Sequence, residues 1–104
     1  AEKGRESVLD GIPPTLPALA AAQKVLRRAA GIEVEPDPAV GPPTGLVELL
    51  VDDQALGDLL LGVAGAARAV GLDAEEALRG AVSRFSTTVR AAEQNRLFGE
   101  DAHR

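Results

Sequence analysis

The chain has 104 residues and a mass of 10.7 kDa, the size of one small domain. It has no Cys, which excludes disulfides and thiolate chemistry, and its single His, His103, argues against a Ser-His-Asp triad or a two-His zinc site. The net charge of −5 disfavours nucleic acid as a partner, and no apolar run approaches the ~20 residues that span a bilayer. The charged start lacks the apolar core of a signal peptide, so we expect a cytoplasmic protein without a membrane partner.

Proline and charge divide the chain into segments. All seven prolines lie before residue 44, and the stretch 31–44 holds four of them with two Gly, so it is predicted to be a loop. Residues 32–58 carry seven acids and no base, the strongest charge asymmetry in the chain. Residues 1–12 are predicted to be a linker or flexible arm, residues 13–96 the folded domain, and residues 97–104 a frayed tail.

Two helical stretches are predicted before residue 71. The first is expected to begin at Thr15 as the N-cap, with Pro17 in its first turn, and to stop at Gly31. In the second, residues 46–70, apolar side chains recur at spacings of three and four. The pattern leaves open whether this stretch is one helix of about 25 residues or two, with Asp53 capping the second.

A third helix follows Gly71, which is expected to end the previous one. Asp73 with Glu76 is typical of a helix N-cap with an acidic third residue. The apolar side chains then follow spacings of four, three, four and three, at Leu78, Val82, Phe85, Val89 and Ala92. This stripe favours an antiparallel hairpin with the preceding helix or a dimer seam, and the fold class is predicted to be all-α with three main helices.

The acidic stretch supplies candidate ligands for Mg²⁺, which prefers carboxylate oxygens. On a continuous helix Glu48 and Asp52 share a face, whereas Asp58 lies about 80° away from Glu48. From a straight helix these three carboxylates could not meet on one metal ion, but a break at Asp52 and Asp53 would let them do so. The alternative interpretation is that the acids form the solvated polar side of an amphipathic helix. Candidate phosphate ligands are the basic residues Lys24, Arg27, Arg28, Arg84 and Arg90.

The order of several short segments resembles the C-terminal domain of MazG-type nucleoside triphosphate pyrophosphohydrolases. The segments that carry the resemblance are Asp10-Gly11-Ile12-Pro13, Leu16-Pro17-Ala18-Leu19, Ala22-Gln23-Lys24, Leu56-Gly57-Asp58-Leu59-Leu60, Glu75-Glu76-Ala77-Leu78 and Arg84-Phe85. The resemblance covers roughly residues 7–94. It implies an all-α fold of helical hairpins that pairs into dimers, and Mg²⁺-dependent hydrolysis of NTPs to NMP and pyrophosphate.

The resemblance also shows departures at the expected metal site. The family holds its metal ions with a Glu-Glu-x-x-Glu and a Glu-x-x-Asp motif; the first is absent here, and in the second Asp58 is present but Ala55 stands at the Glu position. Of the basic residues that the resemblance implies for nucleotide binding, Lys24 and Arg84 remain, whereas Val82 stands where the family usually has Asn.

Three hypotheses follow from this pattern. The leading one is a catalytically degenerate domain with a structural, dimerising or regulatory role, joined by its charged arm to an upstream MazG-like catalytic domain of the same chain. The second is an active pyrophosphohydrolase that uses Asp58 with Glu48, Asp52 or Asp53 on Mg²⁺; it needs that metal as a cofactor, and the first needs none. The third is a helical interaction module unrelated to nucleotides.

Overall fold

The computed structural model describes residues 7–37 and 41–102, with side chains as far as Arg96. These residues form four helices and no strand: α1 (Ala18–Gly31), α2 (Leu46–Leu49), α3 (Asp53–Ala69) and α4 (Ala74–Ala102). The predicted all-α class is therefore confirmed. The chain divides into two compact units, one made of residues 1–35 and 78–104 and the other of residues 36–77.

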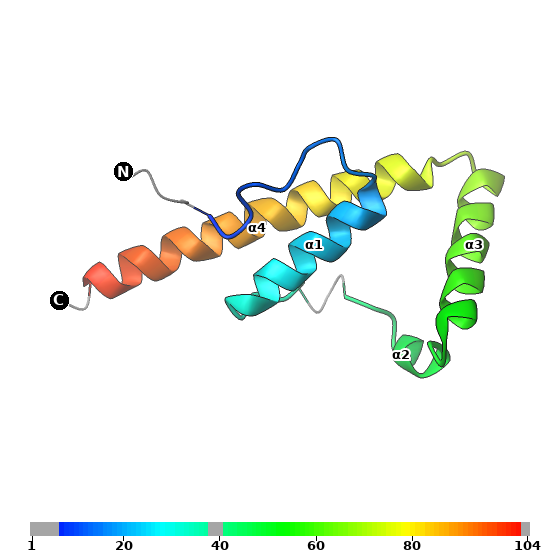
Figure 1. Ribbon diagram of the computed structural model, residues 1–104, viewed down its shortest axis with the longest axis horizontal. Helices are drawn as coiled ribbons and strands as arrows, with labels where there is room; N and C mark the ends of the chain where they lie inside the picture. Colours follow the sequence, from blue (N-terminus) through cyan, green and yellow to red (C-terminus); the bar gives the residue numbers. More distant parts are fainter. Residues whose placement is uncertain (1–6, 38–40, 103–104) are drawn as a thin grey trace. The chain divides into compact units, whose positions relative to one another are not determined.

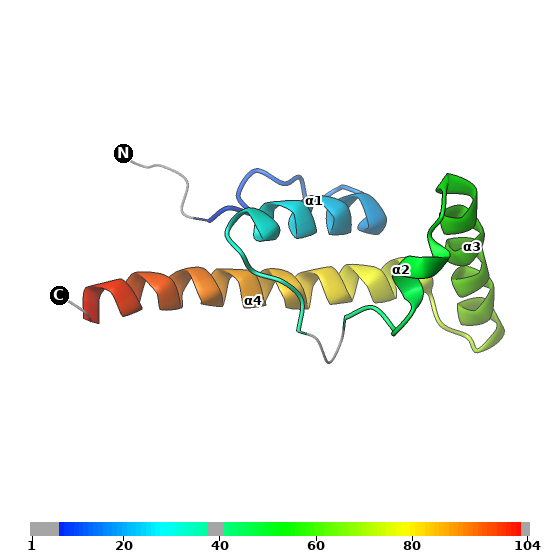
Figure 2. The ribbon, with the colours of Figure 1, turned by 90° about the horizontal axis from the view of Figure 1, so that it is seen from below.

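In the first unit α1 lies along α4, and the two helices run in the same direction (Figures 1 and 2). The buried residues of α1 are small and follow helical spacing: Ala18, Ala22, Val25 and Ala29. They make one narrow apolar face, which packs with fully buried Val89 of α4 in the core cluster. The apolar stripe predicted for the third helix therefore packs against the first helix, which is far away in the sequence.

The segment that precedes α1 completes this core. Leu9 is buried in the same cluster as Val25 and Val89. The backbone is fixed by side chains from both helices. Arg28 Nη1 of α1 donates to the carbonyl oxygens of Val8 (3.2 Å) and Asp10 (2.8 Å), and Glu93 Oε2 of α4 accepts from the Val8 N–H (2.8 Å). The prediction of a flexible arm over residues 1–12 thus needs correction for residues 7–12, because their apolar side chains are needed to cover α1 and α4; residues 1–6 lie outside the described residues.

Helix α1 begins two residues later than predicted. Its N-cap is Pro17, with extended backbone and no side-chain hydrogen bond, so the prediction that Thr15 caps this helix is wrong. The physical reason is Pro17 itself, because a proline disfavours helical backbone at the residue before it and thereby excludes Leu16 from the helix.

The second unit contains α2 and α3, and it decides the question of continuity: residues 46–70 form two helices. The break lies at residues 50–52, and Asp52 caps α3 by accepting a hydrogen bond from the Ala55 N–H (2.8 Å). The prediction named Asp53, which is instead the first residue of the helix. The Asp73 cap is confirmed, since its Oδ1 accepts from the Glu76 N–H at 2.9 Å. Helix α4 continues to Ala102, well into the stretch 97–104 where fraying was predicted.

Candidate functional site

The four carboxylates predicted as magnesium ligands occupy different parts of the second unit. Glu48 lies on the four-residue helix α2, and Asp52 is the N-cap of α3. Asp53 and Asp58 lie on α3, and all four side chains are exposed. The break before α3 removes the shared helix face that was predicted for Glu48 and Asp52.

These carboxylates do not make a recognisable metal site. Asp53 and Asp58 are five residues apart, which places them about 140° from each other around α3. Asp52 uses one carboxylate oxygen on the backbone of its own helix. Among the described residues, no group of three or more His, Cys, Asp or Glu is arranged to hold a metal ion. The residues present therefore do not fit the Mg²⁺ that the family resemblance implies.

The two predicted nucleotide ligands belong to the first unit. Lys24 lies on α1, half-buried, and Arg84 lies exposed on α4. Arg84 is five residues before the core residue Val89, hence about 140° away from it around the helix. Arg84 is therefore turned from the core face of α4, and none of the printed contacts joins it to Lys24.

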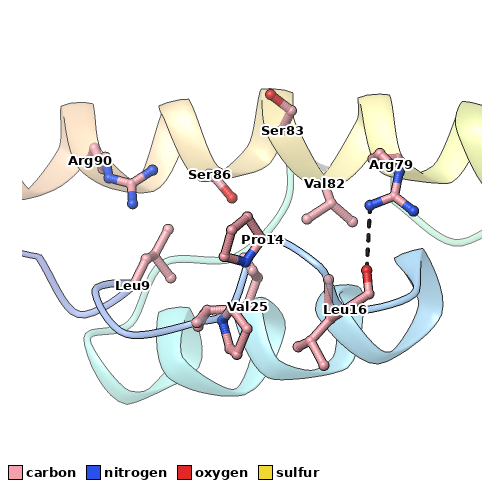
Figure 3. Close-up of a pocket in the computed structure, with 12 residues that line it drawn as sticks. Leu9, Pro14, Leu16, Val25, Arg79, Val82, Ser83, Ser86 and Arg90 are labelled. Atoms are coloured by element: carbon pink, nitrogen blue, oxygen red, sulfur yellow. Dashed lines mark hydrogen bonds between the residues drawn. The ribbon is translucent and has the colours of Figure 1, made fainter.

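The described residues also form a concave feature that none of the sequence-based predictions named. A groove of about 330 Å³ lies between α4, α1 and the stretch 9–16 (Figure 3). Its α4 side is a polar stripe of Arg79, Ser83, Ser86 and Arg90, with spacings of four, three and four. That helical spacing is the signal in the sequence, but only the fold shows that Pro13 and Pro14 face it. We call this feature the α4 groove.

The second unit also presents an apolar face. No residue of α3 is buried, although Leu56, Leu59, Leu60, Val63 and Val70 follow one side of the helix and its C-cap. Val63 is 55% exposed, which is unusual for a residue at the centre of an apolar helix stripe. We call these five residues the α3 stripe.

The helices were also compared with what a membrane span requires. Taken singly, none of those in the described residues is long and apolar enough to cross a bilayer; Asp53–Ala69 and Ala74–Arg96 reach the length and composition only together, as a bent pair.

Comparisons with known proteins give a consistent relationship. The chain is 34% identical, over 110 aligned residues that cover 90% of it, to a nucleoside triphosphate pyrophosphohydrolase of Escherichia coli K12, and it matches the protein of the same name from strain O157:H7 equally well. It is 41% identical over 91 residues to an uncharacterised 26.1 kDa protein of Streptomyces cacaoi. No family model and no solved structure matches the chain.

The matched regions are parts of longer proteins. The chain spans 41% of the length of the E. coli protein and 32% of the Streptomyces protein. The similarity extends over nine tenths of this chain. The chain is therefore homologous, over nine tenths of its length, to part of a nucleoside triphosphate pyrophosphohydrolase.

Proposed function

We propose that this chain is a helical domain of a nucleoside triphosphate pyrophosphohydrolase and has a structural, dimerising role without a catalytic centre of its own. The proposal rests on the homology together with the absence, among the described residues, of a carboxylate cluster that could hold a metal ion. Hydrolysis of a polyanionic triphosphate by this route needs metal ions to neutralise the phosphates and activate water. Asp52 is used as a cap and Asp53 and Asp58 diverge around α3, so these acids do not supply that site.

The α3 stripe supports the dimerising part of the proposal. Exposing five large apolar side chains along one helix face to water is unfavourable. Contact with a second copy of the chain would bury these side chains. The catalytic centre is then contributed by an upstream MazG-like domain of the same polypeptide, in the cytoplasm, where NTPs are the substrate.

Pyrophosphate release tests the catalytic part. The 104-residue chain alone would be incubated with a panel of NTPs and dNTPs and with Mg²⁺ or Mn²⁺, after circular dichroism has shown that it is helical. We expect no release above the background of a sample without protein, because no described cluster of carboxylates holds the metal.

The control is the Asp58→Asn variant. Release that disappears both on adding EDTA and in this variant would overturn the proposal and show that the remaining acids assemble an active site. In that case the chain is an Mg²⁺-dependent pyrophosphohydrolase, with Lys24 and Arg84 as the residues to test next for phosphate binding.

A further inference from the structure

The α4 groove has walls that are fixed at both ends. At one end Arg79 Nη1 donates to the carbonyl oxygen of Leu16 (3.3 Å). At the other end the Val8 N–H donates to Oε2 of Glu93 (2.8 Å). Between these two attachments the covering segment contains Pro13 and Pro14, which have no N–H to donate to α4. The groove is thus a preformed feature of this unit, and a ligand would not have to order it.

Three of the four polar residues along the groove, Ser83, Ser86 and Arg90, have side chains without a partner in the described part of the chain. Thr87 and Thr88 donate their hydroxyls to carbonyl oxygens one turn earlier in α4, each at 3.2 Å. Ser83 and Ser86 make no such side-chain bond within the described part of the chain, and Ser86 is half-buried. The guanidinium of Arg90 likewise has no hydrogen bond or ion pair there. Three donors therefore face one groove without a protein acceptor.

The floor and the charge of the groove restrict the ligand. Leu9, Val25 and Val82 with the two prolines give apolar surface, and the close-up shows Pro14 between the Ser86 and Val25 side chains (Figure 3). The lining residues include two Arg and no Asp or Glu. Glu93, three residues after Arg90 on α4, accepts a hydrogen bond from the Val8 N–H. An apolar surface of this kind is complementary to an uncharged ring, and serine hydroxyls beside an arginine are complementary to a phosphate.

We propose that the α4 groove binds a small organic phosphate, a flat ring system that carries one phosphate group, with the ring against Pro13 and Pro14 and the phosphate on Arg90 and Ser86. A nucleoside monophosphate is the member of this class that the chain would meet as a reaction product, and that choice rests on the proposed function. The groove itself lies in the first unit and uses none of the predicted magnesium ligands.

The experiment is a titration of the isotope-labelled 104-residue chain with AMP, adenosine and inorganic phosphate, followed by NMR chemical shifts. We expect AMP to bind more tightly than either part alone, with shifts in Ser83, Ser86 and Arg90. Arg90→Ala should weaken AMP binding about tenfold, because it removes a charge-assisted contact, and leave adenosine unchanged. Arg96→Ala is the matched control, an exposed arginine on the same helix outside the groove, and should change nothing.

A second variant tests the cavity without touching its charge. Ala21→Leu adds volume at a half-buried position that lines the groove, and it should abolish AMP binding while the helical circular dichroism is kept. Equal binding of inorganic phosphate and AMP, equal losses in Arg90→Ala and Arg96→Ala, or full binding by Ala21→Leu would each overturn the proposal. Pyrophosphate release and oligomeric mass do not enter this experiment, so its failure would leave the proposed function standing.

Discussion

Two helices of this chain end in the same backbone motif with different residues in the critical position. After α1 the Val34 N–H donates to the Ala29 carbonyl oxygen (2.9 Å), and after α3 the Leu72 N–H donates to the Ala67 carbonyl oxygen (2.9 Å). Each motif needs one residue with positive φ. At the end of α3 it is Gly71 (φ 79°), whereas at the end of α1 it is Glu33 (φ 63°).

This difference predicts opposite effects of two substitutions. Glu33→Gly should raise the free energy of unfolding by about 0.5–1 kcal/mol, because a left-handed backbone is costly for a residue with a Cβ. Gly71→Ala should lower it by about 1 kcal/mol for the same reason. Urea denaturation followed by circular dichroism would measure both. If both substitutions changed the free energy of unfolding by the same amount in the same direction, positive φ would not be costly at Glu33 or at an alanine in position 71.

At the scale of the element, helix α3 carries the α3 stripe on one side and Gly65 on the opposite side. The α3 stripe follows one side, while Gly65 is nine residues after Leu56 and therefore lies about 180° from it. A Cβ built at Gly65 meets no atom within 4 Å. Small size at this position is thus not required by any contact within the described part of the chain.

Gly65→Ala should therefore stabilise α3. The expected gain is about 0.5–1 kcal/mol in the free energy of unfolding, the usual difference between Gly and Ala inside a helix. Thermal denaturation by circular dichroism, compared with wild type, is the measurement. A loss of stability would mean that a partner packs closely against this side of α3.

At the scale of the whole molecule, the proposed self-association depends on what covers the α3 stripe. The unit that contains it is also strongly acidic, with eight Asp or Glu and one Arg between residues 36 and 77. The rest of the chain carries a small positive charge, since the whole sums to −5. Burial of the α3 stripe favours association between copies, and the like charge of the two acidic units opposes it.

Light scattering over a range of concentrations tests this association. We expect the mass of the wild-type chain to rise with concentration and that of Val63→Lys to stay at the monomer value, because a lysine in the stripe would have to be desolvated. Leu61→Lys is the matched control: Leu61 is 73% exposed and lies about 160° from Val63 around the helix. A wild-type chain that remains monomeric throughout would refute the dimer.

Two local predictions, at Asp73 and Gly71, are confirmed, whereas the cap of α3 is Asp52 and not the predicted Asp53. Asp73 and Gly71 act on their own backbone neighbours, so their roles follow from the sequence. The start of α1 was predicted wrongly because two local signals competed, and Pro17 excluded the turn that Thr15 would have capped. The α4 groove was missed because its two walls are about 70 residues apart in the chain.

The sequence by itself determined the helical class, the third helix start and the relationship to a pyrophosphohydrolase, because periodicity, capping and similarity are local properties of the chain. Only the tertiary structure decided that residues 7–12 belong to the core, that α1 pairs with α4, and that Arg79, Ser83, Ser86 and Arg90 face two prolines. These are contacts between distant segments, whose free energy comes from burying apolar surface and is not specific to one sequence partner. A sequence pattern therefore shows which face of a helix is buried, and only the fold shows which segment packs against that face.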